Sequence, residues 1–393
     1  MVEHNGKFKR VLKRVIYGLI AVILIGILVI ILTGNNHFFK LFANTVMKGR
    51  LGPSIDEYEI FEYRSVGVGT PTQWPRNEAY NKVSLTDAEL AFTNDYGTAA
   101  FLVAKEGELI FEKYWGDYSD SSYTNSWSMA KSIVSHLIGC AIKDGLIASE
   151  NESIGKYLDQ YSGTKVTIRD LLTMSSGFNF DEHYLNPFAY PAKSLYGSDI
   201  ERVHRDYRPN ADPGIFFDYQ SGNTEVLCFI LSKVTKKSVS EYASEKLWKP
   251  IGAEHPARWS LDHINGIEKG YCCFNSNARD FAKFGQLYLN KGMVQGDALI
   301  DPIYFDMATN QAKLLTLDGK KCTKYGYQWW ILDSAEEHIF YARGIQGQYI
   351  FILPKSGLVI VRLGHSRTQE QHNGHPLDVY EYIKLGKRLA GVN

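Results

Sequence analysis

Several features are scarce in this chain of 393 residues. It has no net charge, because 43 Lys and Arg balance 43 Asp and Glu. It therefore lacks the basic surface by which proteins usually bind nucleic acid. Its 12 prolines and 34 glycines are too few and too scattered for a collagen-like or low-complexity chain. The remaining composition is that of a globular protein, and the length allows two or three domains or one large domain with an inserted subdomain.

Cysteine is too rare for a disulfide scaffold. The five cysteines are Cys140, Cys228, Cys272, Cys273 and Cys322. None belongs to a C-x-x-C pair or has a histidine at zinc-finger spacing. A ring closed by the two adjacent cysteines would be strained, and we interpret most of the five as small buried side chains.

Histidine clusters only near the C-terminus, as His365, His372 and His375. Their spacing is not that of metal ligands, and Gly374 and Pro376 interrupt any helix that would align them. This pattern favours a solvated loop. The sequence thus predicts neither a metal nor a cofactor.

One long hydrophobic run is present, at residues 15–32, which read VIYGLIAVILIGILVIIL. As a helix it would be about 27 Å long, which matches the hydrocarbon core of a bilayer. Positive charge is denser before the run (Lys7, Lys9, Arg10, Lys13, Arg14) than after it (Lys40, Lys48, Arg50). The positive-inside bias predicts a cytoplasmic tail at 1–14, an anchor at 15–33 and a single-pass protein of the inner (cytoplasmic) membrane. The rest of the chain would then be periplasmic or extracellular.

A cleaved signal peptide is the alternative interpretation of this run. Signal peptides have an apolar region of about 7–15 residues followed by a small-residue cleavage site. The run here is longer, and residues 32–36, LTGNN, contain no such site. An uncleaved anchor is favoured.

The remainder divides into a stalk and lead-in at 34–92 and one domain at 93–393. Apolar runs on both sides of KEGE predict a hairpin over 99–116. Apolar spacing near 3.6 residues and capping residues predict helices, and β-rich runs near the C-terminus predict strands. The predicted helices are 129–143, 166–174, 224–236, 240–247, 277–289 and 378–389, the strands are 325–332, 337–342, 348–353 and 358–363, and 178–213 is expected to be rich in loops. Strands at both ends with a helical insertion at about 150–290 predict an α+β fold, in which helices flank one antiparallel sheet completed by both halves.

The motif Ser128-x-x-Lys131 opens the most regular of these helices. Residues three apart share a helical face, so the lysine can reach the serine hydroxyl. A serine needs such a base to become a nucleophile, and a lysine serves once its pKa is lowered. Two further copies, at 153–156 and 162–165, lie in polar glycine-containing stretches and are interpreted as chance. An ordinary helix-capping serine is the alternative for Ser128.

Two later elements complete a candidate site. Tyr219 precedes an apolar helix, where a phenol can accept and return a proton. Gly344 and Gly347 flank a strand entrance whose backbone N–H groups are available to a substrate carbonyl. Each element alone also fits an ordinary role, the tyrosine in packing and the glycines in a hairpin turn.

Ser128-x-x-Lys131, Tyr219-x-Ser221 and the strand near Gly344 together resemble the penicillin-recognising serine hydrolases. The chain is most similar to the class C β-lactamase-like branch, and the segments NSWSMAKS, LLTMSSGF, YQSGNTEVL and ARGIQGQYI resemble its 6-aminohexanoate-dimer hydrolase and esterase subgroup. The resemblance implies a β-lactamase/transpeptidase-like fold. It implies Ser128 as acylated nucleophile, Lys131 as its proton partner, Tyr219 as general acid/base, and the N–H groups of Ser128 and Ile345 as the oxyanion hole.

The same resemblance implies a set of substrate-binding residues. Ser221 stands where many relatives have the Asn of Y-x-N, and Tyr184 matches a loop tyrosine that contacts amide substrates. Where β-lactamases of this fold have K-T-G, this chain reads Ala342-Arg343-Gly344. Arg343 would supply the positive charge, and Gly344 would let the strand approach the substrate.

These expectations combine into a membrane-anchored periplasmic serine hydrolase. It would cleave a small-molecule ester or amide through an acyl-serine intermediate, with the membrane as its other partner and no nucleic acid. One alternative is a D,D-peptidase or β-lactamase-like enzyme acting on peptidoglycan or β-lactams. The other is a non-catalytic cell-envelope binding protein on the same fold. The oligomeric state is left open.

Overall fold

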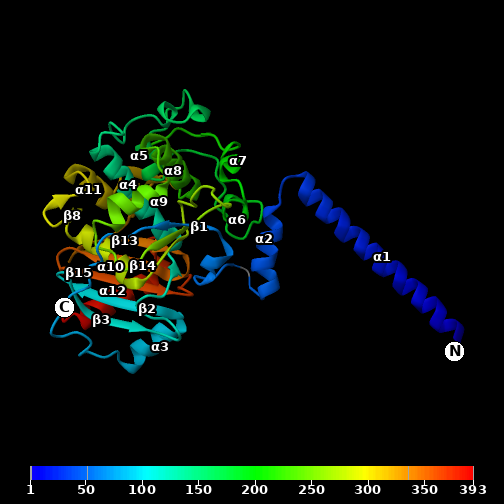
Figure 1. Ribbon diagram of the computed structural model, residues 1–393, viewed down its shortest axis with the longest axis horizontal. Helices are drawn as coiled ribbons and strands as arrows, with labels where there is room; N and C mark the ends of the chain where they lie inside the picture. Colours follow the sequence, from blue (N-terminus) through cyan, green and yellow to red (C-terminus); the bar gives the residue numbers. More distant parts are fainter. Residues whose placement is uncertain (1, 51, 335, 393) are drawn as a thin grey trace.

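A six-stranded antiparallel sheet lies at the centre of the protein (Figure 1). The computed structural model describes residues 2–50, 52–334 and 336–392. In spatial order the strands are β12 (Trp330–Asp333), β13 (His338–Gly344), β14 (Gln348–Leu353), β15 (Leu358–Gly364), β2 (Thr98–Lys105) and β3 (Glu108–Tyr114). Because β15 pairs with β2, both ends of the domain complete one sheet. The predicted α+β architecture is confirmed.

Helices cover both faces of this sheet. α10 (Ala278–Leu289) packs on β14, β15 and β2, with α4 (Ala130–Lys143) in the same hydrophobic core. α12 (Leu377–Leu389) packs on β15 and α3 (Asp87–Asp95) packs on β2, and α12 shares a second core with the opposite sheet face. Every residue of β14 and β15 is consequently buried. This is why both strands read as continuous apolar runs rather than alternating ones.

The helical part of the domain packs around α4, whose side chains from Ala130 to Ala141 are all buried. Its neighbours include α5 (Ile168–Leu172), α8 (Ser221–Thr235) and α9 (Val239–Ala243), which continues as a π-helical turn to Trp248. Thr167 caps α5 and Asn277 caps α10, each accepting a hydrogen bond from a backbone N–H of the first turn. The predicted helices are present, with ends shifted by a few residues.

Three local predictions differ from the structure. The loop-rich segment 178–213 contains two short helices, α6 (Tyr190–Tyr196) and α7 (Ile200–His204). The predicted strand 325–332 is wrong in its first half. There Gln328 has a φ of 63°, and its side chain donates to the carbonyls of Leu171 and Leu172, which ties this stretch to α5. The helical insertion is only partly helical, because β6 (Ala257–Ser260) and β7 (Phe274–Ser276) form a sheet with β1 (Tyr63–Val66) and β4 (Thr124–Asn125).

Smaller elements complete the domain. β5 precedes α8 and pairs in parallel with β10. Hairpins β8–β9 and β16–β17 form separate two-stranded sheets outside the six-stranded sheet, and α11 lies against α4. Their bounds are β5 (Phe216–Phe217), β8 (Met293–Val294), β9 (Asp297–Ala298), α11 (Pro302–Thr309), β10 (Leu314–Thr316), β11 (Lys321–Cys322), β16 (Gln371–His372) and β17 (His375–Pro376).

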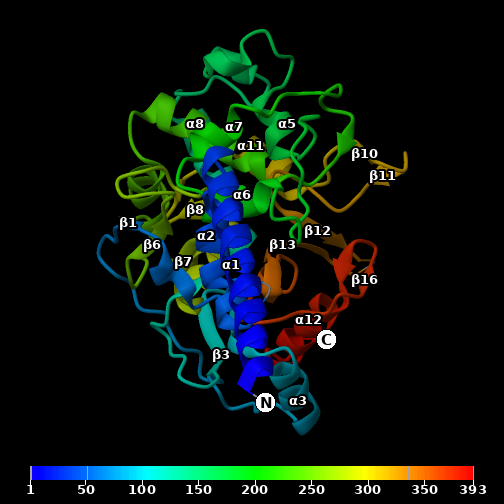
Figure 2. The ribbon, with the colours of Figure 1, turned by 90° about the vertical axis from the view of Figure 1, so that its right-hand side faces the viewer.

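The N-terminal helix α1 (Val2–Leu32) projects from the domain (Figures 1 and 2). Residues 9–32 contain an 18-residue window with a mean hydropathy of 3.3, and none of that window is buried. The helix is long and apolar enough to cross a membrane, as a membrane anchor or a signal sequence would be. α2 (His37–Asn44) then turns back and packs against α6. The rest of the 34–92 segment also lies against the domain, through β1 and the buried side chains of Ile55 and Phe61.

The cysteines fall into two groups. Cys140, Cys228 and Cys322 are buried free thiols, as predicted. Cys272 and Cys273 form a disulfide, so this pair does close the ring between adjacent cysteines and stands apart from the other three. Cys273 has a φ of 67°. It thus leaves the extended conformation, in which neighbouring side chains point to opposite sides.

Candidate active site

Ser128 lies in a tight turn at the start of α4. The preceding residue, Trp127, has a φ of 46°, which is costly for a bulky side chain. Two hydrogen bonds hold it there: its backbone N–H donates to Asn125 Oδ1 at 2.9 Å, and its indole N–H donates to Gln346 Oε1 at 2.9 Å. The turn places Ser128 in the wall of a cavity.

Lys131 lies one helical turn after Ser128 and is buried. Its Nζ donates to Ser128 Oγ at 3.1 Å, to Ser221 Oγ at 3.1 Å and to the carbonyl oxygen of Tyr271 at 2.8 Å. Burial lowers the pKa of Lys131 to about 8, although Glu182 acts in the opposite direction. The predicted pairing of serine and lysine is present in the structure, and a substantial fraction of this lysine is neutral near physiological pH.

Tyr219 connects β5 to α8 and faces the same pair. Its ring centroid is 5.2 Å from Lys131 Nζ and 5.7 Å from the ring of Trp330. Burial raises the pKa of Tyr219, while the neighbouring Ser128 hydroxyl and Arg343 act in the opposite direction. The phenol therefore stays protonated over the range in which Lys131 titrates, which suits a proton donor.

The end of β13 packs against the turn that carries Ser128. A Cβ on Gly344 would lie against the carbonyl oxygen of Ser126 and 3.0 Å from Trp127 Cβ, so glycine lets the strand approach the serine turn. Ile345 follows, and it lines two cavities together with Ser128. The buried Arg362 donates to the carbonyls of Gln346 and Gly347 at 2.8 Å and fixes this turn. The residues predicted for the oxyanion hole thus lie on neighbouring walls.

Two cavities meet at Ser128. The larger, of about 290 Å³, is lined by side chains of α2, α6 and the 271–272 segment, and we call it the apolar cavity. The smaller, of about 130 Å³, is lined by Tyr219, Trp330, Arg343 and Arg367, and we call it the arginine cavity. The nucleophile candidate thus lies between an apolar and a cationic compartment.

The predicted substrate-binding residues lie around these cavities. The Arg343 guanidinium lies over the Trp330 ring, 3.2 Å from its centroid, and donates to the Gly374 carbonyl at 3.2 Å. Tyr184 borders both cavities. It is half exposed, and its hydroxyl donates to Glu182 Oε1 at 2.9 Å.

Glu182 is a site residue that the sequence did not reveal. Its carboxylate accepts hydrogen bonds from the backbone N–H of Ser221, at 2.7 Å, and from the Ser221 hydroxyl. Burial raises its pKa, and the nearby Lys131 lowers it. Nothing in the spacing of a single loop glutamate marks it. Arg362 did leave a signal, because it is a charged residue inside the apolar run LVIVRLG.

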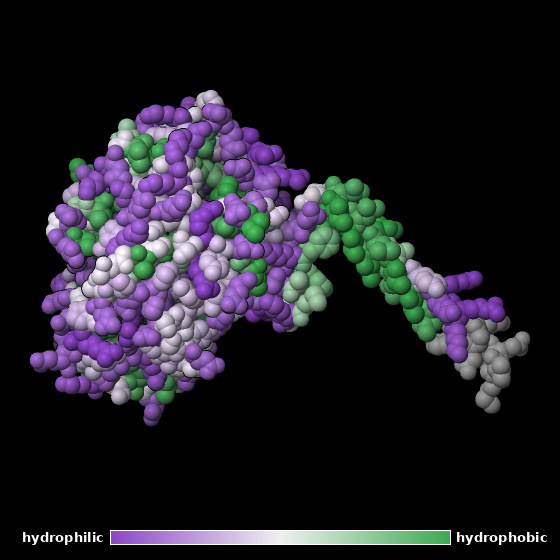
Figure 3. Space-filling view, in the orientation of Figure 1, coloured by the Kyte–Doolittle hydropathy of each residue, from purple (hydrophilic) through white to green (hydrophobic). Residues whose placement is uncertain are grey.

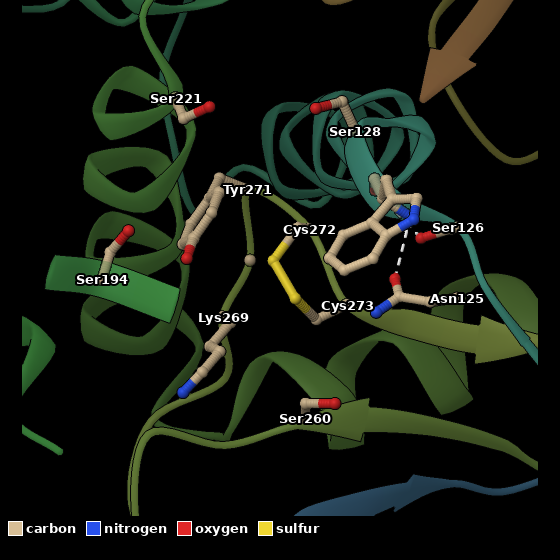
Figure 4. The surroundings of a disulfide bond; sticks show 12 residues. Asn125, Ser126, Ser128, Ser194, Ser221, Ser260, Lys269, Tyr271, Cys272 and Cys273 are labelled. Atoms are coloured by element: carbon tan, nitrogen blue, oxygen red, sulfur yellow. Dashed lines mark hydrogen bonds between the residues drawn. A yellow bond between two sulfur atoms is a disulfide. The ribbon is translucent and has the colours of Figure 1, made fainter. Parts of the chain in front are cut away.

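The disulfide lies directly below this cluster (Figure 4). Figure 4 shows the hydroxyls of Ser128 and Ser221 pointing towards each other, with Tyr271 below Ser221 and the disulfide to the right of Tyr271. Cys272 also lines the apolar cavity. The bond therefore lies beside the segment whose Tyr271 carbonyl accepts a hydrogen bond from Lys131.

Known proteins resemble both the sequence and the fold. The chain is 25% identical over 317 residues to the 6-aminohexanoate-dimer hydrolase of Paenarthrobacter ureafaciens, covering 75% of this chain and 79% of that protein. A putative 6-aminohexanoate-dimer hydrolase from Bacillus anthracis superimposes with a TM-score of 0.72 at 25% identity, over 86% of this chain and 94% of that one. A family VIII carboxylesterase shares the fold, with a TM-score of 0.61 at 19% identity over 81% of this chain and 99% of that one.

The family model described as Beta-lactamase matches residues 86–379. This stretch contains Ser128, Lys131, Tyr219 and the β13 edge. It is more than half of the chain. The predicted resemblance is thereby confirmed, and this chain belongs to the beta-lactamase family.

Proposed function

We propose that this protein is a membrane-anchored serine hydrolase that cleaves an ester or amide bond. The observation that carries the proposal is the buried Lys131 ammonium, 3.1 Å from Ser128 Oγ and with a pKa lowered to about 8. A lysine with this pKa can take the serine proton, and burial would not favour such a cation in a merely structural role.

Acylation follows from this arrangement. Lys131 accepts the proton of Ser128, whose Oγ attacks the substrate carbonyl carbon. The N–H groups of Ser128 and Ile345 stabilise the oxyanion. Tyr219 donates its proton to the leaving oxygen or nitrogen as the acyl bond breaks. Transfer of the proton from the Lys131 ammonium to the Tyr219 phenolate, directly or through water, restores the tyrosine and the neutral lysine.

Deacylation repeats these steps with water as the nucleophile and Ser128 Oγ as the leaving oxygen. Water attacks the acyl-Ser128 carbonyl and loses its proton to the same basic groups. The acid product leaves and the serine hydroxyl is regenerated. Ser221 and Glu182 hold Lys131 from the side away from Ser128, so we assign them positioning roles.

The arrangement of the cavities supports an orientation for the substrate. Tyr219 lines the arginine cavity, so the leaving group that it protonates lies there. Arg343 and Arg367 would attract a carboxylate on that group. This charge also favours a second candidate function, hydrolysis of β-lactams or D,D-peptides. Hydrolysis of nitrocefin at a rate comparable to that of simple esters would support it.

The membrane anchor rests on α1, whose residues 15–32 are free of charge and include no buried residue. Basic residues precede this stretch more densely than they follow it, which favours a cytoplasmic N-terminus and a catalytic domain on the periplasmic or extracellular side.

One measurement tests both parts of this proposal. Full-length protein purified from membranes is treated with a fluorophosphonate probe, whose phosphorus bonds to an activated serine as fluoride leaves. Intact-mass spectrometry should show a mass that still includes α1 and a single adduct, which peptide mapping places on Ser128. A mass lacking α1 would contradict the anchor, and a folded protein without an adduct would contradict the hydrolase.

The rate should depend on pH through Lys131. Only the neutral amine accepts the serine proton, so kcat/KM is expected to rise with pH and to reach half its maximum near pH 8. A pH series with a p-nitrophenyl ester measures this, after subtraction of spontaneous hydrolysis. Burial raises the pKa of Glu225 to about 8 as well. If kcat/KM of a Lys131→Met protein still rises near pH 8, the rise would therefore be due to another titrating residue such as Glu225.

A further inference from the structure

We propose that the apolar cavity binds the acyl chain of an amphiphile, so that the substrate is an ester or amide of a long-chain fatty acid taken up from the membrane surface. This inference rests on the proposed hydrolase function and names its substrate class. It follows from the uncharged lining of the cavity, from the contribution of α2 to its wall and from the exposed apolar side chains on the segments that line it.

The orientation of the leaving group determines where the acyl half of the substrate lies. The leaving group lies in the arginine cavity, because Tyr219 lines that cavity. The carbonyl carbon must lie at Ser128, where the two cavities meet. The acyl group consequently extends into the apolar cavity.

That cavity suits a hydrocarbon chain. Of the residues described as lining it, none is charged. Side chains of α6 form one wall, namely Pro191, Ala192, Leu195 and Tyr196. At about 290 Å³ the cavity is near the lower limit of ordinary small-molecule sites, a volume that can hold the part of one acyl chain nearest Ser128.

The remaining wall comes from the segment that follows α1. Leu41 and Thr45, from α2 and the residue after it, line the cavity together with Pro53. α2 is held in place because His37 Nε2 lies 2.8 Å from the Pro187 carbonyl oxygen. Its Phe38 ring is also 5.0 Å from that of Phe188. The membrane-proximal segment is thus part of the site, rather than a tether only.

Exposed apolar side chains lie on two segments that contribute to the apolar cavity. Leu185 lines the cavity and is 84% exposed. On α2 and just after it, Phe39, Phe42 and Met47 are also exposed, the last by 71%. α2 begins shortly after α1 ends at Leu32, and Figure 3 shows it as a pale green surface beside the green α1. Aromatic and apolar side chains this close to a spanning helix lie at the membrane interface.

The first test varies the acyl chain while the leaving group stays constant. Full-length protein in phospholipid nanodiscs hydrolyses the p-nitrophenyl esters of acetate, butyrate, hexanoate and octanoate. Each buried methylene contributes about a fourfold gain in kcat/KM. The octanoate ester should therefore exceed the acetate ester by roughly 100-fold or more, even if only part of the chain is buried. This wild-type series does not depend on how any variant folds.

A matched pair of variants locates the effect. Leu41→Asp places a carboxylate in the cavity wall, and the octanoate-to-acetate ratio should fall at least roughly tenfold. Leu317→Asp introduces the same change at a leucine that is 71% exposed and outside the cavity, and it should leave the ratio unchanged. If the acetate ester is cleaved through Ser128 but kcat/KM stays constant or falls as the acyl chain lengthens, the acyl-chain inference is overturned while the hydrolase function still stands. Absence of both ester cleavage and the fluorophosphonate adduct would overturn the hydrolase itself.

The second test identifies the source of the substrate. 4-Methylumbelliferyl palmitate is embedded in phosphatidylglycerol vesicles that contain the full-length protein, or in separate vesicles mixed with protein-bearing ones. Turnover confined to shared vesicles supports uptake from the bilayer. Equal turnover from separate vesicles overturns that source, because the substrate would then reach the cavity through water.

Discussion

Replacing Ser128 by alanine is expected to lower kcat/KM for p-nitrophenyl esters by about 10⁴-fold or more. The substitution removes the oxygen that forms the acyl intermediate, and losses of this size are typical for serine nucleophiles. The cavities, the oxyanion N–H groups and Lys131 all remain. Initial rates of the full-length wild-type and variant proteins, measured at several ester concentrations, give the comparison.

A matched control is available within the chain. Ser162 belongs to a chance Ser-x-x-Lys copy, is exposed, and should be replaceable by alanine without loss of activity. Turnover by Ser128→Ala within tenfold of the wild type would contradict the acyl-serine mechanism. Such a result would direct the search to another nucleophile.

Replacing Lys131 by methionine should lower kcat by about 10³-fold. Methionine has a similar length and is readily accommodated in a buried position, but it cannot accept the proton of Ser128. General-base groups contribute about 10²–10⁴-fold. The effect should fall on kcat more than on KM, because Lys131 contacts Ser128 rather than a substrate cavity. The pH dependence near 8 should disappear with it.

The exposed lysine of the same chance motif is the control for this variant. Lys165→Met changes an exposed side chain and should keep wild-type kinetics. The substitution removes the cationic neighbour of the buried Glu182, which then takes up a proton. Because this change could disturb the fold, circular dichroism is used to verify that Lys131→Met is folded. A folded Lys131→Met protein with kcat within tenfold of the wild type would contradict the assignment of Lys131 as the base.

Long, strongly patterned elements were predictable from the sequence. α4, α10 and α12 have regular apolar spacing, and the hairpin of β2 and β3 has a polar turn between two apolar runs. Short helices such as α6 and α7 were not predictable, because five to seven residues give too little periodicity. The residues 325–329 look like a strand, but Gln328 bonds to distant carbonyls that local sequence does not reveal.

In the candidate site, too, residues close in sequence were predictable and contacts between distant segments were not. Ser128 and Lys131 are neighbours in sequence, so helical geometry alone brings them together. Tyr219 and Gly344 were candidates from their local context that the family resemblance strengthened, and both line a cavity together with Ser128. Glu182 and the Tyr271 carbonyl were beyond prediction, since they join the site only through contacts between separate loops. The α2 wall was missed because a segment next to an anchor is most simply interpreted as a spacer.

The pairing of β2 with β15 has a consequence for how the protein is made. Lys105 lies opposite Leu358, about 250 residues later in the chain. At ordinary synthesis rates of about 5–20 residues per second, the edge of β2 waits roughly 13–50 s for its partner strand to be synthesised. During most of that interval Ser128 lacks the β13 edge beside it, and an apolar strand edge is open to wrong partners. Under the proposed function, ester or amide cleavage is therefore absent until β13, β14 and β15 have been synthesised and have paired.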